Sequence, residues 1–168
     1  MESSSGFSIR PYDASTDEAS VRRAFVELQE AERVLDPHMP PGEQVVDAYL
    51  EDLFDQCEKT KGTFYVAVED STGRVAGYVA VLGEVPSDEP DDDPTPYAYL
   101  SDLIVLSDFR GRGVATQLTG VAEAHARGLG MSRIRLQALA RNADARRLYE
   151  RVGYSDHIVQ MEKRFETE

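Results

Sequence analysis

A hydrophobic segment that runs through an arginine- and glycine-rich turn into a helical pattern is the feature that most constrains this chain. The stretch LIVLSDFRGRGVATQL places strand-forming residues directly before the start of a helix. A helix that begins near Gly113 leaves its first N–H groups without intrahelical partners, and its dipole adds positive charge there. Gly111 and Gly113 let a phosphate approach the backbone, while charge and a hydroxyl donor come from Arg110, Arg112 and Thr116. The turn therefore predicts a pyrophosphate site; the alternative is a tight turn whose arginines only face solvent.

Two familiar phosphate loops do not fit these residues. The chain has no G-x-x-x-x-G-K-[ST] motif, which excludes a P-loop. The letters GRGVAT begin like the dinucleotide-binding fingerprint, but Thr116 stands where its third glycine or alanine belongs. The next predicted strand ends in ALARN and offers no acidic residue to hold a ribose. A nicotinamide cofactor is therefore not expected.

Apolar periodicity along the 168 residues predicts one domain with a mixed sheet covered by helices. The expected strands are residues 7–12, 63–70, 75–85, 97–106, 133–140 and 157–165, and the expected helices begin at Ser15 and cover 45–57, 113–130 and 143–152. We expect residues 1–6 to form a flexible tail. Residues 86–96 contain five acids, four prolines and no basic residue, which predicts a mobile acidic loop. The single domain then spans residues 1–168.

Two sequence blocks in the second half of the chain resemble the GNAT superfamily of N-acetyltransferases. RGRGVA, residues 110–115, fits the [RQ]-x-x-G-x-[GA] motif of that family. NADARRLYERVGY, residues 142–154, resembles its N-x-x-A-x-x-L-Y-x-x-x-G-[FY] block. The element order also agrees, so the resemblance covers nearly the whole chain. It implies an α/β (α+β) fold with a mixed, mostly antiparallel central sheet covered by helices on both faces.

The resemblance further implies that acetyl-CoA is the co-substrate. Its pyrophosphate would bind the backbone amides of the turn, and a bulged strand would offer backbone groups to the pantetheine arm and the thioester oxygen. Asn142 is expected to cap a helix on sequence alone, and the resemblance adds a contact with acetyl-CoA. The residues expected to bind acetyl-CoA are Leu103, Ile104, Val105, Arg110, Gly111, Arg112, Gly113, Val114, Ala115, Thr116 and Asn142.

Amide formation from a thioester needs a group that takes a proton from the amine and a group that gives one to the leaving thiolate. Tyr149 matches the family's general-acid tyrosine, although it could instead be a half-buried tyrosine that packs on the sheet. Asp102 is a carboxylate in an apolar strand, and the surrounding letters YLSDLIVLSDFRGRG resemble spermidine/spermine acetyltransferases. Those enzymes have two adjacent acids, and Ser101 replaces the first here. Asp102 is expected to anchor an ammonium group or act as a base through water; the alternative is an outward-facing strand residue.

Charge and composition limit the partners. The formal net charge of -13 disfavours nucleic acid and anionic lipid and favours cationic partners. Glu27, Glu30 and Glu32 are candidates for the acceptor cleft, or else form a solvated helix face.

The single cysteine, Cys57, forms no internal disulfide, and the three histidines have no ligand-like spacing to it, so we expect no metal. Without an apolar run typical of a signal peptide or a membrane span, a cytoplasmic location is expected.

The function that follows is transfer of the acetyl group of acetyl-CoA to a primary amine by direct attack in a ternary complex. The acceptor is expected to be a cationic small molecule, such as a polyamine, an aminoglycoside-like antibiotic or a small amino compound. Two alternatives stay open: acetylation of a protein lysine or N-terminus, and a non-catalytic acyl-CoA-binding sensor. A homodimer is possible, and the sequence does not decide the oligomeric state.

Overall fold

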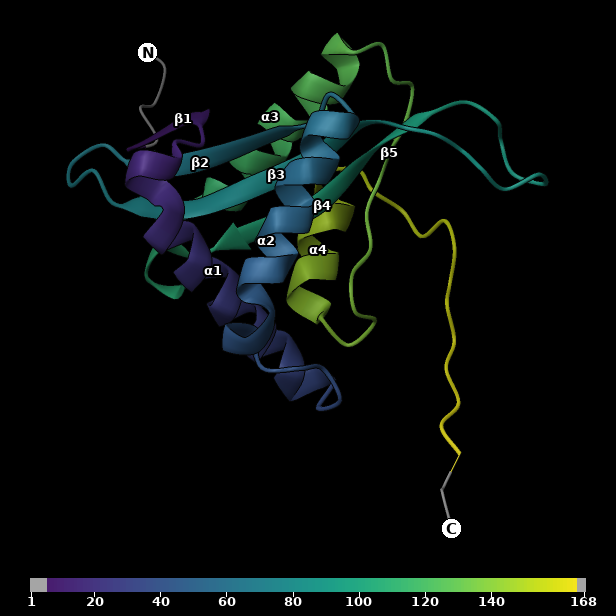
Figure 1. The fold of residues 1–168 in the computed structure, drawn as a ribbon, viewed down its shortest axis with the longest axis horizontal. Helices are drawn as coiled ribbons and strands as arrows, with labels where there is room; N and C mark the ends of the chain where they lie inside the picture. The colour runs from purple at the N-terminus through teal and green to yellow at the C-terminus, as the bar shows by residue number, and fades with distance from the viewer. Residues whose placement is uncertain (1–5, 166–168) are drawn as a thin grey trace.

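A five-stranded sheet with the order β1-β2-β3-β4-β5 forms the centre of the computed structural model, which describes residues 6–165 (Figure 1). The strands are β1 (Phe7–Pro11), β2 (Thr63–Glu69), β3 (Val75–Val85), β4 (Tyr97–Val105) and β5 (Ile134–Arg135). Each pair from β1 to β4 is antiparallel, and only β4 and β5 are parallel. The expected mixed, mostly antiparallel sheet is therefore confirmed.

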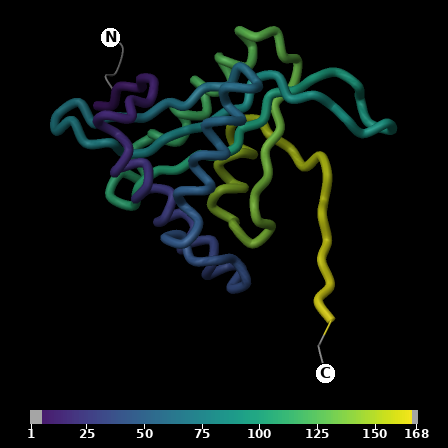
Figure 2. The backbone as a smooth tube through the Cα atoms, in the orientation of Figure 1, coloured from purple at the N-terminus to yellow at the C-terminus, as the bar shows by residue number. Residues whose placement is uncertain are grey.

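Helices cover both faces of this sheet. The helices are α1 (Ala14–Leu35), α2 (Gly42–Lys59), α3 (Val114–Gly128) and α4 (Ala143–Arg151). In Figures 1 and 2, α1 and α2 lie in front of the sheet and α3 lies behind it. Residues 75–83 of β3 are all buried. Because successive strand side chains point to opposite faces, an uninterrupted buried run requires cover on both sides.

The first helix begins at Ala14, one residue before the predicted start at Ser15. Asp13, not Ser15, is the N-cap, and its Oδ1 accepts from the Ser15 N–H at 2.9 Å. Asp17 Oδ2 in turn accepts from the Asp13 N–H at 2.9 Å. Both Asp17 carboxylate oxygens also accept hydrogen bonds from the Arg10 guanidinium, at 2.6 and 2.8 Å. The helix start is thus joined to β1 by a buried carboxylate, which a local capping pattern does not reveal.

The end of the chain differs most from the sequence prediction. The strand expected at 133–140 contains only Ile134–Arg135, and the strand expected at 157–165 does not form. Residues 155–165 instead extend away from the body (Figures 1 and 2). A β-prone sequence becomes a strand only where another strand takes its backbone hydrogen bonds, and residues 155–165 have no such neighbour.

The remaining predicted segments lie at the edges of the fold. The tail predicted at residues 1–6 lies outside the described residues except for Gly6. Residues 86–96 connect β3 to β4 without helix or strand, and two of their acids pair with arginines. Asp92 lies 2.8 Å from Arg135, and Asp93 lies 3.3 Å from Arg133. Between residues 6 and 165, no helix is long and apolar enough to cross a membrane.

Candidate active site

The candidate site lies where β4 and β5 diverge. The two strands pair only at Ala98 with Ile134 and at Tyr99 with Arg135. Beyond Tyr99, the β5-facing edge of β4 has no strand partner in the described part of the chain. A bulge lies at the same place, because Ala80 and Val81 of β3 pair with Asp102 and Leu100 and leave Ser101 extra. These two features leave the edge of β4 that contains Leu103, Ile104 and Val105 without a strand partner in the described chain, and the role of these three residues in binding acetyl-CoA stays a prediction.

The turn that follows β4 has the geometry of an anion site. Gly113 is the N-cap of α3 in the left-handed conformation, with φ of 80°, and Gly111 has φ of 71°. As a glycine, Gly113 makes no side-chain capping hydrogen bond to α3. A Cβ built on either glycine would meet no heavy atom within 4 Å, so the space beside this backbone is open. The backbone at the start of α3 is therefore accessible, and the first N–H groups of a helix favour an anion.

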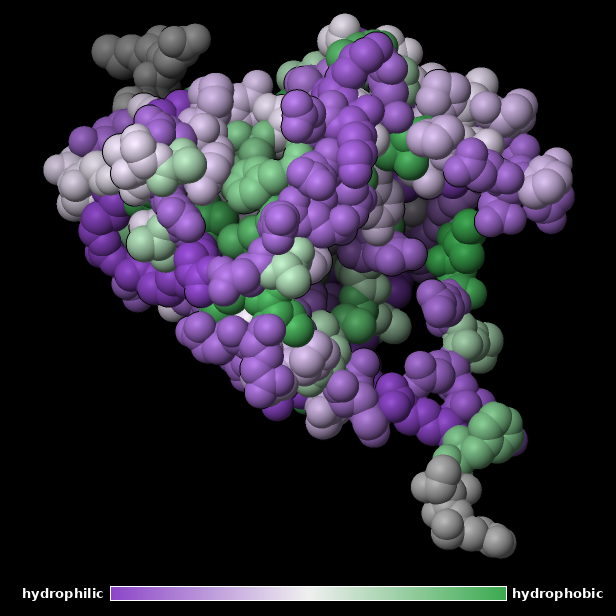
Figure 3. All heavy atoms as spheres, in the orientation of Figure 1, coloured by the Kyte–Doolittle hydropathy of each residue, from purple (hydrophilic) through white to green (hydrophobic). Residues whose placement is uncertain are grey.

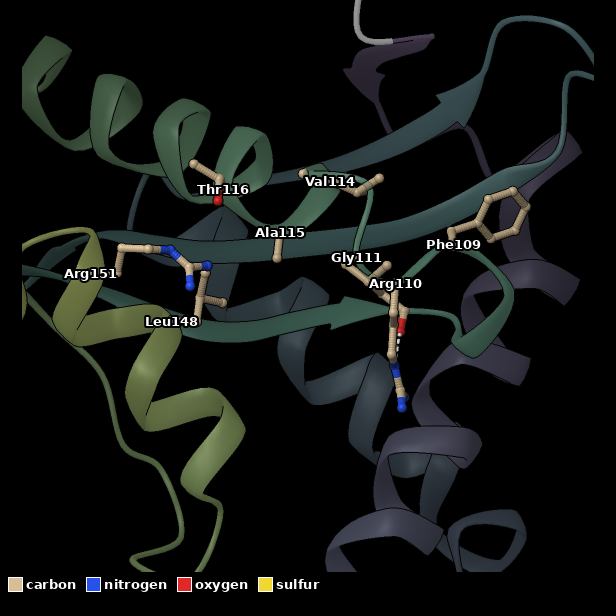
Figure 4. Close-up of a pocket in the computed structure, with 10 residues that line it drawn as sticks. Phe109, Arg110, Gly111, Val114, Ala115, Thr116, Leu148 and Arg151 are labelled. Carbon is tan, nitrogen blue, oxygen red and sulfur yellow. Dashed lines mark hydrogen bonds between the residues drawn. The ribbon is translucent and has the colours of Figure 1, made fainter.

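A pocket at this turn brings two helices together. It is lined by Val105, Phe109, Arg110, Gly111, Gly113, Val114, Ala115, Thr116, Leu148 and Arg151 (Figure 4). Figure 4 shows Leu148 and Arg151 of α4 facing Ala115 and Thr116 in the first turn of α3. The sequence prediction did not include this pair. Their i,i+3 spacing on one helix face was the available signal, and Arg151 adds a positive charge beside the helix N-terminus.

The two arginines of the turn are held by the protein itself. Arg110 donates through Nε to the Val105 carbonyl at 3.1 Å and through Nη2 to Glu27 at 3.2 Å. Arg112 does not line the pocket; it donates to Glu69 at 2.7 Å and lies over the Phe7 ring at 4.5 Å. These contacts fix the turn to α1 and to the sheet. Arg151 consequently lines the pocket, whereas Arg112 lies outside it.

Asp102 is a buried carboxylate held by two tyrosines. Only 5% of the residue is exposed, and its Oδ1 accepts from Tyr49 Oη at 2.5 Å while Oδ2 accepts from Tyr78 Oη at 2.8 Å. Burial raises the pKa of Asp102, and the two hydrogen bonds oppose that effect. Tyr49 is 37% exposed and connects the carboxylate to the surface. Asp102 therefore faces inward, unlike the outward-facing alternative, and Tyr49 is the partly exposed group that contacts its carboxylate.

Tyr149 lies on α4 with its hydroxyl free of hydrogen bonds to any residue from 6 to 165. Burial first, and then the negative charges of Asp102 and Glu32, raise the pKa of Tyr149 to about 12. The phenol is consequently protonated at neutral pH and available as a proton donor. Its ring packs edge to face on Tyr154, with 5.7 Å between centroids. The Tyr149 ring therefore packs on Tyr154, while its hydroxyl makes no hydrogen bond within residues 6–165.

The three glutamates of α1 have different surroundings. Glu27 accepts from the Ser107 N–H at 2.7 Å, and Glu30 accepts from the Gly42 N–H at 2.8 Å. Glu27 therefore joins α1 to the turn after β4, and Glu30 joins α1 to the start of α2. The Glu32 side chain has no hydrogen-bond or ion-pair partner in the described chain, and burial, followed by the charge of Asp102, raises its pKa. Of the three, only Glu32 remains available to an acceptor.

Asn142 caps α4, as its sequence position predicts. Its Oδ1 accepts from the Ala145 N–H at 3.2 Å. This cap fixes the start of the short helix that carries Leu148, Tyr149 and Arg151. Among residues 6–165, no group of three or more His, Cys, Asp or Glu side chains is arranged to hold a metal ion.

Comparison with known proteins gives the class to which this fold and site belong. The model of the Acetyltransferase (GNAT) family matches residues 25–154, which include β4, the glycine turn and α4. This is well over half of the chain. The chain therefore belongs to the GNAT family of acetyltransferases, as its two sequence blocks predict.

Individual proteins also agree with this assignment, either over part of the sequence or in the fold. The chain is 33% identical over 76 residues to the uncharacterized N-acetyltransferase YycN of Bacillus subtilis (strain 168); the match covers 45% of this chain and 48% of that protein, about half of its length. Its fold is similar to glucosamine-6-phosphate N-acetyltransferase from Arabidopsis thaliana, with TM-score 0.66 and 19% identity over 95% of this chain and 99% of that one. AAC(6')-Iy bound to the bisubstrate analogue CoA-S-monomethyl-acetylneamine gives TM-score 0.66 and 20% identity over the same shares. These two structures show a shared fold.

Proposed function

We propose that this protein transfers the acetyl group of acetyl-CoA to a primary amine of a cationic small molecule, by direct attack in a ternary complex. The observation that carries the proposal is one continuous path in the structure. It leads from the uncapped N-terminus of α3, along the unpaired edge of β4, to the Asp102–Tyr49 pair. Each part of this path has the chemistry that one part of the reaction requires.

The residues at the glycine turn fit the pyrophosphate of acetyl-CoA. First-turn N–H groups, the positive end of the α3 dipole and Arg151 all favour an anion there. The unpaired edge of β4 offers backbone donors and acceptors that an amide-containing arm requires. Acetyl-CoA, when bound, supplies an activated thioester. That AAC(6')-Iy, which shares this fold, binds a CoA bisubstrate analogue supports the assignment.

Tyr49 and Asp102 can take the proton that the amine must lose. The Tyr49 hydroxyl accepts a proton from the amine as it passes its own proton to Asp102 Oδ1, 2.5 Å away. Because burial raises the pKa of Asp102, this carboxylate is a stronger base than an exposed one. Tyr149 donates its phenolic proton to the departing sulfur. The Tyr49–Asp102 pair therefore takes up the proton that the amine loses, and Tyr149 releases the proton that the departing sulfur gains.

The acidic surroundings of this path favour a cationic acceptor. The Glu32 side chain has no hydrogen-bond or ion-pair partner within the described chain, and its charge contributes to raising the pKa of Tyr49 and of Tyr149. The net charge of -13 adds a long-range attraction for cations. The named fold neighbours act on an amino sugar phosphate and carry an aminoglycoside-derived analogue, which supports a small amine rather than a protein substrate.

An amine panel tests the proposed function. Purified protein is incubated with acetyl-CoA and polyamines, aminoglycosides, amino sugars, and peptides with free lysine or N-terminal amines, and thiol release is followed. We expect turnover with small cationic amines, and about 100- to 10,000-fold less turnover in Tyr149→Phe. Acetyl-CoA binding without turnover on any amine would overturn the proposal in favour of a sensor. Turnover with peptides alone would indicate that the acceptor is a protein and not a small molecule.

A further inference from the structure

The turn between β4 and α3 has one side chain between its two glycines. Gly111 and Gly113 have φ of 71° and 80°, and a glycine backbone adopts positive and negative φ with similar ease. Figure 4 shows the turn passing through Gly111 on its way from β4 to α3. Arg112 lies between the two glycines, while Arg110, which precedes them, is held separately by Glu27. The side chain of Arg112 is therefore the group that can restrain this three-residue stretch.

Arg112 is held by a buried carboxylate and two buried rings. Its Nη2 donates to Glu69 Oε1 at 2.7 Å, and its guanidinium carbon lies 4.5 Å from the centre of the Phe7 ring and 5.6 Å from that of Phe109. Glu69, Phe7 and Phe109 are all buried. A hydrogen bond between ionised groups is stronger than one between neutral groups, and a planar guanidinium also stacks on aromatic rings. These contacts together fix the position of Arg112.

Glu69 is itself held by the hairpin that joins β2 to β3 (Figure 1). It is the last residue of β2 and lies opposite Phe7 in the β1–β2 pairing. Its carbonyl oxygen accepts from the Thr72 and Gly73 N–H groups at 3.3 and 2.8 Å, and its Oε2 accepts from Thr72 Oγ1 at 2.7 Å. The Thr72 hydrogen bond, followed by that of Arg112, lowers the pKa of Glu69. The carboxylate is therefore ionised at neutral pH, and both of its oxygens have donors.

We propose that Glu69 is a positioning residue for acetyl-CoA: through Arg112, it holds the turn in the conformation that leaves the start of α3 accessible to the pyrophosphate. This inference rests on the proposed function, because it takes this turn as the acetyl-CoA site. Glu69 does not line the pocket, so it acts through Arg112 and not by contact with acetyl-CoA. A turn that is already in its binding conformation loses less freedom when the anion binds, which increases affinity.

Charge and positioning predict opposite effects when the Glu69 carboxylate is removed. This carboxylate offsets the charge of Arg112, so on charge alone its loss would strengthen the binding of an anion at the turn. Loss of the anchor instead lets the turn leave its binding conformation. If that conformation falls to about a tenth of the population, the apparent Kd of acetyl-CoA rises about tenfold. Long-range attraction hardly changes, because a single charge is lost from a formal net charge of -13 on a surface that is largely hydrophilic in Figure 3.

Two substitutions at Glu69 remove the same charge but differ in hydrogen bonding. Glu69→Ala removes the anchor, whereas Glu69→Gln keeps an amide oxygen that accepts from Arg112. In titration calorimetry, we expect the Kd of acetyl-CoA to rise about tenfold in Glu69→Ala and less than about threefold in Glu69→Gln. The KM for acetyl-CoA should follow the Kd, while kcat at saturating acetyl-CoA stays at the parental value. In an Arg112→Ala background, Glu69→Ala should cause no further loss, because Glu69 acts through Arg112.

Asp108→Ala is the matched control. Asp108 also pairs with an arginine beside the turn, but its side chain and that of Arg74 are 71% and 52% exposed, and such a pair contributes little. The Kd of acetyl-CoA should therefore stay within about twofold of the parent. Should Glu69→Ala fail to fold, Thr72→Val on the exposed hairpin removes the hydroxyl that orients the same carboxylate. A Kd about threefold above the parent in Thr72→Val would support the anchor, and an unchanged Kd would overturn it.

Hydrogen exchange of the ligand-free chain tests the anchor without acetyl-CoA. The Gln117 N–H donates to the Gly113 carbonyl at 3.2 Å, so its exchange rate reports opening of the turn. We expect faster exchange in Glu69→Ala and near-parental exchange in Glu69→Gln, with circular dichroism showing that both variants are folded. A parent that binds no acetyl-CoA would refute the proposed function, and the exchange rates would then decide the role of Glu69 alone. Equal or tighter binding in Glu69→Ala, or an equal loss in the alanine and glutamine variants, overturns the proposal.

Discussion

Replacing Asp102 by asparagine separates the charge of this residue from its shape. Asp102 is 5% exposed and accepts two tyrosine hydrogen bonds, at 2.5 and 2.8 Å. In Asp102→Asn, bonds worth about 1.5–3 kcal/mol each become neutral bonds worth about 0.5–1.5 kcal/mol. Relief from burying a charge offsets part of that loss. We therefore expect the free energy of unfolding to fall by about 1–2 kcal/mol or less, which leaves the variant folded.

The effect of Asp102→Asn on turnover should be much larger. A carboxylate that takes up the amine proton contributes about 100- to 10,000-fold, or roughly 3–5 kcal/mol of barrier. Thiol release should therefore show kcat/KM reduced by that order at low and high salt alike. Isothermal titration should show an acetyl-CoA Kd close to that of the parent. Neutralising the acids of the loop 86–96 should instead cause a small loss that is confined to low salt, because long-range attraction is screened over about 10 Å at 0.1 M.

The two tyrosines that hold Asp102 provide a matched pair of variants. Tyr49 connects the carboxylate to the surface, whereas Tyr78 is fully buried on the opposite oxygen. Tyr49→Phe should lower kcat/KM nearly as much as Asp102→Asn, while Tyr78→Phe should retain most of the activity. An intact kcat/KM in Asp102→Asn for the best amine would refute this reasoning and make Glu32 the next candidate base. Equal losses in both tyrosine variants would mean that the cluster is structural.

Three further predictions concern other parts of the chain. Tyr149→Phe should reduce kcat about 100- to 10,000-fold with little change in acetyl-CoA Kd, measured by steady-state kinetics and titration; parental turnover would show that another group supplies the proton. Gly113→Asp should abolish acetyl-CoA binding in titration calorimetry of a folded variant, because it places a Cβ and a negative charge where φ is 80° and a phosphate must approach; undiminished affinity would rule out this turn. The hydrogen bonds from Arg10 hold the pKa of Asp17 below its ordinary value, so the unfolded chain binds this proton more readily. The resulting stability should be present above about pH 4 and fall as the pH drops through the lower native pKa, and urea unfolding of Asp17→Asn should show a smaller acid loss than the parent; equal acid losses would contradict the assignment.

The turn and its helix could be predicted from sequence because their geometry is local. The helix begins next to Gly113, where the sequence predicts its start, and glycine permits the left-handed φ values found at Gly111 and Gly113. Asn142 illustrates the same point, since a cap contacts the first turn of its own helix. These features involve neighbours a few residues apart, and their outcome matches the prediction.

The partners of Asp102 could not be predicted, because they come from distant parts of the chain. Tyr49 and Tyr78 lie 53 and 24 residues away, on α2 and β3, and meet only when the sheet and helix pack. The orientation of Arg112 has the same origin, because Glu69 on β2 and Phe7 on β1 draw it from the pocket. Residues 157–165 show a further limit: their pattern is that of a strand, but a strand also needs a partner that the pattern does not supply.

Product analysis tests the central claim most directly. The protein is mixed with acetyl-CoA, first alone and then with the best amine of the panel, and both the chain and the amine are examined by mass spectrometry. We predict that the chain stays unacetylated in the first mixture and that, in the second, acetylated amine forms in equal amount to free CoA. An acetyl group on the chain that then passes to the amine would contradict direct attack in a ternary complex. CoA release without any acetylated amine would contradict acetyl transfer to an amine altogether.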